Sequence, residues 1–463
     1  MRINYLPTAN PRPIGAPAQA GRGRVGTKPS ATRRLTHLAL AAMLGLQFGP
    51  ASMAGNAVTD WHANMESAVV VTAKKGPPGV FVFFAYADVA MYDAVNSIDG
   101  RFQPFAVRVP ATPGASKDAA ASVAAHDVLV HYLPHLAPLQ QGTLDAELQA
   151  SLAAIPDGPA KTEGIGVGHA VAAQWLALRS GDGLEAPVSL SPPSPSPGIW
   201  EPVPTYPSPN PITPPPVAEW EAQFKPFALR SADQFLELVP PPPSLTSSTF
   251  TSDFNLTKAY GAFNSTVRTA QQTEIGRFWA DNTAAQYSRA LRGLVESQGL
   301  DTADAARLGA LSFVTLADSA TACFNAKYHY WFWRPFTAIR NADTDGNPNT
   351  VADPNWVPLD VTPGHPEYPA AHGCITEALM DTLTAFFHTD AIPYSVTSTV
   401  TGTVHSFISF DDVVAEVDDA RIFGGMHYHH SVKEGNRLGR YVADYILTHK
   451  FCRADEECGR DAE

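Results

Sequence analysis

Apolar residues recur every three or four positions along most of the chain, which is the spacing of one face of an α-helix. This spacing predicts helices over residues 60–75, 81–98, 119–133, 139–154, 163–178, 273–298, 302–326, 372–387, 413–423 and 433–447. The alternation of apolar and polar residues that is typical of a strand is scarce. The pattern therefore predicts an all-α fold.

A proline-rich segment interrupts the helical pattern. Thirteen prolines lie between Pro187 and Pro216, where no helix can continue. The segment could be a disordered linker, but it and the residues just after it contain aromatic side chains, which linkers seldom have: Trp200, Tyr206, Trp220, Phe224 and Phe227. We expect an ordered strap over 187–243, between an N-terminal helical half (55–186) and a C-terminal helical half (244–463).

The first 54 residues have the pattern of a secretory signal peptide. They contain seven Lys or Arg and no Asp or Glu, and the apolar stretch from Leu38 to Phe48 is followed by the small residues Ala51 to Ala54. Arg33 and Arg34 precede the apolar stretch, as in twin-arginine export signals. A basic tail on a cytosolic protein is the alternative. We expect export to the periplasm or the medium.

Charge and cysteine content limit the other possibilities. The 463-residue chain has a formal net charge of −13, which argues against nucleic acid as a partner, because binding its phosphates needs a basic face. No run after the signal reaches the roughly 18 apolar residues of a membrane span. Four cysteines do not make a disulfide scaffold, but Cys452 and Cys458 could close a small loop, whereas Cys323 and Cys374 lie in apolar surroundings and are expected to be buried.

Three short groups in the C-terminal half have complementary chemistry. In the first, Lys327 and Arg334 are seven residues apart, close to two helical turns, so both side chains could point at one spot. The second runs from Pro363 to Gly373 and leads from a proline-rich turn into a helix, whose free amides favour anions. In the third, Arg421 and His427 flank two glycines.

Taken together, the three groups suit an oxyanion. Arginine binds oxygen atoms in pairs, lysine adds a point charge, and histidine can bond a central atom or transfer protons. Each group alone also has a structural interpretation: solvated helix charges for Lys327 and Arg334, a salt bridge to Asp418 or Asp419 for Arg421, or a buried structural role for His427. Their occurrence in this order favours the oxyanion site.

The ordered set resembles the vanadium-dependent haloperoxidases and the related type 2 phosphatidic acid phosphatases. The resemblance rests on Lys327 with Arg334-Pro335, then Tyr368-Pro369 with His372, then Arg421 with His427. It implies two four-helix bundles, with vanadate bound in the second. It also implies hydrogen peroxide and a halide as substrates, with a small organic acceptor as a further partner.

The resemblance also implies a role for each residue. Lys327, Arg334 and Arg421, with the backbone amide of Ala371, would hold the equatorial oxygens of vanadate. His427 would be the axial ligand of the metal, and in the phosphatases the matching histidine is the nucleophile. His372 would be the acid–base residue. His365 would set halide preference, because a histidine at the matching position goes with bromoperoxidases and a phenylalanine with the chloroperoxidase.

The chain departs from the family pattern at two places. Ala370-Ala371 stands where the family usually has Ser-Gly, so one hydroxyl contact, worth on the order of 1–3 kcal/mol, is missing. Four residues after His427, many members have Asp, and this chain has Ser431. A carboxylate that orients His427 must then come from elsewhere, and Glu434 is the neighbouring candidate.

Two patterns could indicate other metals. His427, His429 and His430 lack the spacing of a zinc helix. The run from Asp343 to Asn349 resembles the start of a calcium loop, but Pro354 stands at the twelfth position, where such a loop has Glu, and an Asp/Asn-rich turn is favoured.

Three functions follow as hypotheses. The first is an exported vanadate-dependent peroxidase that oxidises bromide or iodide, with Lys327 polarising the activated oxygen and His372 managing its protons. The second is an acid phosphatase that uses His427 in the same pocket. The third is a non-catalytic oxyanion-binding protein.

Overall fold

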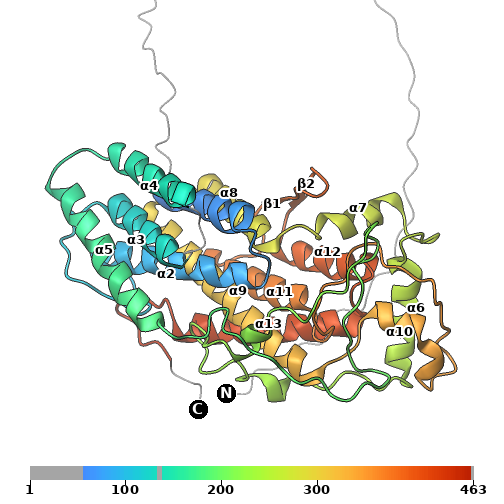
Figure 1. Ribbon diagram of the computed structural model, residues 1–463. Helices are drawn as coiled ribbons and strands as arrows, with labels where there is room; N and C mark the ends of the chain where they lie inside the picture. The colour runs from blue at the N-terminus through green and yellow to red at the C-terminus, as the bar shows by residue number, and fades with distance from the viewer. Residues whose placement is uncertain (1–55, 133–137, 460–463) are drawn as a thin grey trace, which may run out of the picture. The chain divides into compact units, whose positions relative to one another are not determined.

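The computed structural model describes residues 56–132 and 138–459, and within them the fold is helical (Figure 1). The helices are α1 (Ala57–Met65), α2 (Gly79–Asp99), α3 (Lys117–Tyr132), α4 (Pro138–Ala153), α5 (Pro159–Arg179), α6 (Ser248–Gly261), α7 (Ala270–Phe278), α8 (Thr283–Gln298), α9 (Thr302–Tyr330), α10 (Pro335–Arg340), α11 (Ala371–Phe387), α12 (Phe410–Phe423) and α13 (His429–His449). The prediction of an all-α fold is confirmed. The signal sequence predicted over residues 1–54 lies outside the described residues.

Helix α9 lies at the centre of the fold. On one side it packs against α2, which packs in turn against α3 and α5, and on the other side it packs against α11 and α13, with α12 beside α11 (Figure 1). Asp301 caps its first turn by accepting hydrogen bonds from the amides of Ala303 and Asp304. The buried side chains of α2, α9 and α11 form one continuous core. Among the described helices, none is long and apolar enough to cross a membrane.

The structure differs from the predicted elements at three places. The helix predicted over 273–298 is two helices, because Asn282 accepts a hydrogen bond from the amide of Ala285 and so begins α8 as an N-cap. The helix predicted over 60–75 becomes a π-helix from Glu66 to Thr72. A two-stranded antiparallel hairpin, β1 (Tyr394–Thr397) with β2 (Val404–Phe407), forms where no strand was predicted.

The proline-rich segment packs against the end of α9 and the turn before α11. The amide of Trp200 donates to the carbonyl oxygen of Trp331 at 2.6 Å, and the amide of Val217 donates to that of Gly364 at 2.9 Å. Farther along, the carboxylate of Asp318 on α9 accepts three backbone hydrogen bonds from residues 227–229. The first two contacts place the segment beside the first and second of the sequence groups described above.

Two glycines let α13 approach α11 closely. A Cβ atom at Gly439 would collide with the carbonyl oxygen of Cys374, and one at Gly435 would lie 2.5 Å from the carbonyl oxygen of Ala370. The absence of a side chain at these two positions lets the backbones of α11 and α13 lie in direct contact. Any larger residue would push the two helices apart.

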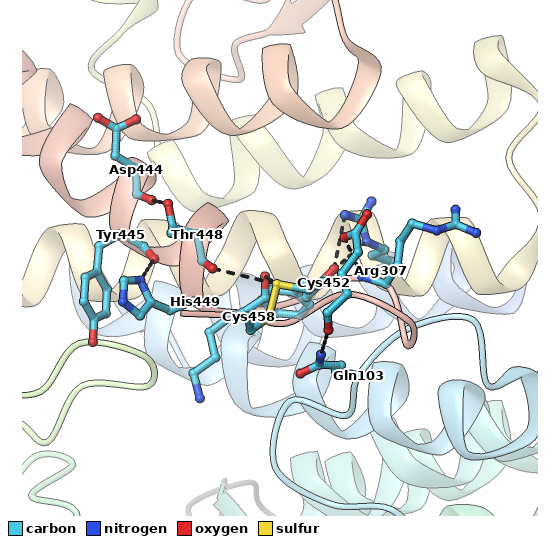
Figure 2. The surroundings of a disulfide bond; sticks show 12 residues. Gln103, Arg307, Asp444, Tyr445, Thr448, His449, Cys452 and Cys458 are labelled. Atoms are coloured by element: carbon cyan, nitrogen blue, oxygen red, sulfur yellow. Dashed lines mark hydrogen bonds between the residues drawn. A yellow bond between two sulfur atoms is a disulfide. The ribbon is translucent and has the colours of Figure 1, made fainter. Parts of the chain in front are cut away.

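Cys452 and Cys458 form a disulfide that closes the loop after α13, as the sequence suggested (Figure 2). The loop is attached to the N-terminal half, because the carbonyl oxygen of Cys452 accepts from the amide of Gln103 at 2.9 Å. Arg307 on α9 donates to the carbonyl oxygen of Phe451. Cys323 and Cys374 are free and buried, in agreement with the sequence analysis.

Candidate oxyanion site

Lys327 lies in the last turn of α9 and is fully buried. Its ammonium group donates to three carbonyl oxygens of the turn before α11, those of Pro366 at 3.1 Å, Glu367 at 2.8 Å and Pro369 at 2.5 Å. These three bonds use all three of its protons. Burial lowers the pKa of Lys327 to about 8. Lys327 therefore holds the shape of the turn and brings positive charge to it.

Arg334 approaches the same turn from a different element. The chain leaves α9 at Trp331, which has a left-handed backbone with φ of 50°, and Arg334 stands at the N-cap of α10. Lys327 and Arg334 thus do not share one helix, but both side chains reach the turn. Arg334 donates to the carbonyl oxygens of His365 at 2.9 Å and Met426 at 3.0 Å, which fastens the second group to the third.

The imidazole of His427 is oriented by Glu367. Its Nδ1 donates to the Glu367 carboxylate at 2.8 Å, which leaves Nε2 as the unprotonated nitrogen, 3.1 Å from a guanidinium nitrogen of Arg334. Ser431 donates to the other carboxylate oxygen of Glu367 at 2.6 Å. Burial, followed by the charge of Arg334, lowers the pKa of His427 well below its usual range, so the ring is neutral.

Glu434 does not orient His427, and that expectation is corrected. Its carboxylate forms an ion pair with Arg437 one turn along α13, at 3.0 Å. Glu367 was missed by the sequence analysis, although a signal was present: it is the only acidic residue from Val361 to Gly373, a stretch rich in proline and small residues. A carboxylate in such surroundings is expected to have a specific partner.

His372 and Ala371 begin α11, where Ala370 occupies the N-cap position without a side-chain hydrogen bond. The first amides of this helix therefore have no side-chain cap among the described residues. His372 Nε2 lies 3.1 Å from the hydroxyl of Thr283, the first residue of α8, which the sequence analysis did not single out. Burial, followed by the charge of Arg421, lowers the pKa of His372 well below its usual range.

Arg421 lies in the last turn of α12 and is buried. One terminal nitrogen donates to the carbonyl oxygen of Trp279 at 2.9 Å, and the other contacts the sulfur of Met426 at 2.9 Å, which is a weak acceptor. Its Nε has no partner among the described residues, and neither has Oδ2 of Asp360, which the charge of Arg421 reaches. A buried guanidinium with a free donor is suited to an anion.

A cavity of about 530 Å³ collects these groups. His365, Ala371, His372, Arg421 and His427 line it, whereas Lys327 and Arg334 lie behind its wall. The ring of His365 packs on Phe324, with centroids 4.9 Å apart. The remaining wall is mostly apolar: Pro77, Pro78, Phe81, Val217, Trp279, Ala280, Ala320, Phe324, Val361, Pro363, Ile375, Val400 and Met426. Its polar residues are Asp281, Asn282, Thr283 and Asp360.

The two patterns considered for other metals have hydrogen-bond partners. His430 binds the carboxylate of Asp253 through its side chain at 2.7 Å. Asp345 accepts from the amide of Asn347 at 2.7 Å and from the hydroxyl of Thr350 at 2.7 Å, an arrangement typical of an Asx turn.

Known proteins are similar to the part of the chain that carries this site. Residues 307–453 match the family model of the VCPO second helical-bundle domain. Vanadium chloroperoxidase of Curvularia inaequalis is 26% identical over an alignment of 153 residues, and the match covers 27% of this chain and 24% of that protein. The match thus spans about a quarter of the relative's length.

Solved structures extend the similarity to most of the chain. The crystal structure of a bacterial vanadium-dependent iodoperoxidase has a TM-score of 0.71 at 20% identity, and the match covers 86% of this chain and 98% of that one. An apo-type bacterial vanadium-dependent chloroperoxidase has a TM-score of 0.63 at 15% identity, covering 79% and 92%. The chain therefore has the helical fold of the vanadium haloperoxidases, and residues 307–453 match the family model of a second helical-bundle domain of that kind.

Proposed function

We propose that the protein is a vanadate-dependent peroxidase that oxidises bromide or iodide with hydrogen peroxide. The observation that carries the proposal is the unprotonated Nε2 of His427, which is fixed by Glu367 and shares a cavity with the free Nε of Arg421. A neutral imidazole is a common metal ligand, and a carboxylate on its other nitrogen raises its basicity. The iodoperoxidase and chloroperoxidase similarities support the same reaction class.

The donor set fits vanadate, an oxyanion of a metal. The free Nε of Arg421 and the uncapped amide of Ala371 would bind its oxygens, and His427 would be the metal ligand. Lys327 and Arg334 would compensate negative charge from behind the wall, and either could contact an oxygen directly by exchanging a backbone partner. When bound, vanadate supplies a Lewis acid that takes up hydrogen peroxide and makes its oxygen electrophilic toward a halide.

His372 would hold and move the proton. Its low pKa keeps it neutral at pH 7, so that it can accept a proton from a bound acid, and Thr283 fixes one of its nitrogens. Arg421 adds positive charge beside it. The apolar part of the cavity limits access of water and leaves room for a small organic acceptor.

Export is part of the proposal. The basic and apolar pattern of residues 1–54 supports it, as does the Cys452–Cys458 disulfide, because such bonds persist in oxidising compartments. Cell fractionation and the N-terminal sequence of the purified protein test this point. A chain that begins at Met1 and stays in the cytoplasm would contradict it.

One set of assays tests the activity. Purified protein, with and without added vanadate, is given hydrogen peroxide and bromide with an activated organic acceptor, and separately a phosphate monoester. Vanadate-stimulated bromination is the expected result. Hydrolysis that vanadate inhibits would indicate instead the phosphatase, with His427 as nucleophile, and inactivity in both assays would indicate a binding protein.

A further inference from the structure

Cys323 on α9 and Cys374 on α11 lie in direct contact inside the core. Cys374 donates to the sulfur of Cys323 with the two sulfur atoms 2.7 Å apart, although the residues are 51 positions apart in sequence. Both side chains are fully buried. This distance is shorter than the ordinary contact of two thiols and approaches the disulfide bond length of about 2.05 Å.

The pair lies directly behind the wall of the oxyanion cavity. Cys323 is flanked on α9 by Ala320 and Phe324, and Cys374 is flanked on α11 by Ala371 and Ile375, and all four flanking residues line the cavity. A small neutral oxidant in the cavity is therefore separated from the sulfur atoms by one layer of side chains.

The surroundings favour Cys323 as the attacking thiol. Burial alone would raise its pKa, but the hydrogen bond from Cys374 and the charge of Lys327 outweigh burial and lower the pKa of Cys323. Cys374 has the opposite tendency, since burial and its neighbour Cys323 raise its pKa well above the usual range. Cys323 is thus the thiol that loses its proton more readily and can act as the nucleophile, whereas Cys374 stays protonated.

We propose that Cys323 and Cys374 form a second disulfide, which joins α9 to α11 behind the cavity, with hydrogen peroxide as the oxidant. The source of peroxide rests on the proposed function. The sulfur of Cys323 attacks one peroxide oxygen, the O–O bond breaks, and water and a sulfenic acid result. The sulfur of Cys374 then displaces the sulfenic oxygen as a second water. Two thiols and one peroxide give one disulfide and two waters, and two electrons pass from sulfur to oxygen.

The bond would connect elements that carry the site. Cys323 precedes Lys327 by one helical turn, and Cys374 follows His372 by two residues. The sulfur of Cys323 also lies 3.7 Å from the carbonyl oxygen of Pro369, which accepts from Lys327 as well. A bridge here would hold α9, the turn and the start of α11 together, and a cross-link between distant positions stabilises the fold.

The test measures thiols in protein free of vanadate, so that it does not depend on halogenation. The full chain is treated with hydrogen peroxide, denatured, alkylated and digested without reduction. The expected result is one peptide pair that joins Cys323 to Cys374 and separates on reduction, together with an upward shift of the thermal midpoint. Both cysteines remaining alkylatable after excess peroxide, or oxidised separately without a cross-link, would overturn the proposal.

Variants assign the shift to this pair. Cys323→Ser should fold, leave Cys374 alkylatable and abolish the peroxide-induced rise of the midpoint. The matched control is Cys452→Ser with Cys458→Ser, which lacks the outer disulfide and should keep that rise. A rise that persists in Cys323→Ser would contradict the assignment. Bromination assayed in parallel separates this outcome from failure of the proposed function, because thiol oxidation needs only peroxide.

Discussion

The carboxylate of Glu367 accepts a hydrogen bond from Nδ1 of His427 across 2.8 Å, and both side chains are buried. The same carboxylate accepts from the amide of Tyr428 at 3.1 Å and from the hydroxyl of Ser431. Three donors therefore fix one carboxylate, and the carboxylate fixes the tautomer of one histidine. Metal affinity at this site should therefore depend on Glu367 as well as on His427.

Replacing Glu367 with Gln should weaken vanadate binding by about 10- to 100-fold, the usual effect of removing a partner of a metal-bound histidine. Equilibrium dialysis against vanadate measures the change. Glu434→Gln is the matched control, because Glu434 pairs with Arg437 and does not contact His427. Equal affinities for the two variants would mean that Glu367 does not tune the site.

His427→Ala should abolish vanadate binding and leave the helical circular dichroism spectrum unchanged. The side chain lines the cavity, and Glu367 keeps two other donors after the change. His427→Gln provides a second variant that fills more of the space. If either folded variant binds vanadate as tightly as the parent protein, His427 is not the ligand.

Halide preference should depend on His365. We expect turnover of bromide and iodide with little or none of chloride, which is the hardest of the three to oxidise. Burial and the charge of Arg334 lower the pKa of His365 well below its usual range, so the ring is neutral. Its Nδ1 lies 3.0 Å from a guanidinium nitrogen of Arg334 and 3.1 Å from the carbonyl oxygen of Pro366.

His365→Phe removes these polar contacts and should raise chloride turnover relative to bromide. Steady-state kinetics with the three halides on both proteins measure the ratio. Chloride turnover by the parent protein equal to that of bromide would contradict the prediction, and so would a ratio that His365→Phe leaves unchanged.

Ala370→Ser should tighten vanadate binding by up to about tenfold, which corresponds to about 1.4 kcal/mol for one good hydrogen bond. Ala370 is fully buried and stands at the N-cap of α11, so the new hydroxyl could also cap the helix and raise its stability by about 1 kcal/mol. Calorimetry of binding and of unfolding separates the two effects. Greater stability with unchanged affinity would show that the hydroxyl binds the helix amides and not the anion.

The affinity for vanadate should rise as the pH falls from 8 to 6, and His372 should account for part of the rise. Burial and the charges of Arg421, Lys327 and Arg334 keep the ring neutral in the free protein. A bound anion offsets these charges and raises the pKa of His372, so binding takes up a proton and is favoured by acid.

The control for this pH effect is His372→Gln, which cannot titrate. Protonation of vanadate itself affects both proteins equally, so the ratio of their affinities isolates the histidine. A ratio that is constant with pH would show that His372 does not gain a proton when the anion binds.

The helices and the three groups of the site could be predicted because their signals are local. Periodicity located α2, α9 and α13, and the turn before α11 was recognised from its prolines and from His372. Glu367 could not be assigned to His427, because 60 residues separate them and only the tertiary fold brings them together. The three hydrogen bonds from Lys327 to carbonyl oxygens could not be predicted from the sequence either, since they depend on the path of the turn.

The break between α7 and α8 shows a different limit. Apolar periodicity continues across Trp279 to Asn282, so a pattern-based prediction joins the helices. Asn282 caps the start of α8 and so separates α8 from α7. The break matters for the site because Trp279 lies in it, and the carbonyl oxygen of Trp279 accepts a hydrogen bond from Arg421. A capping signal inside a periodic stretch therefore outweighs the periodicity.

The close contact of α11 and α13 through Gly435 and Gly439 divides the cavity into a part that resists sequence change and a part that tolerates it. His372 is the second residue of α11 and His427 lies just before α13, and the two helices meet backbone to backbone at Gly435 and Gly439, so the anion-binding geometry offers few routes for variation. The opposite wall comes from loop residues, among them Pro77, Val217 and Val400. Under the proposed function, substitutions there would change which organic molecules enter while the charged groups stay in place, so new substrate ranges could evolve without loss of the proposed chemistry.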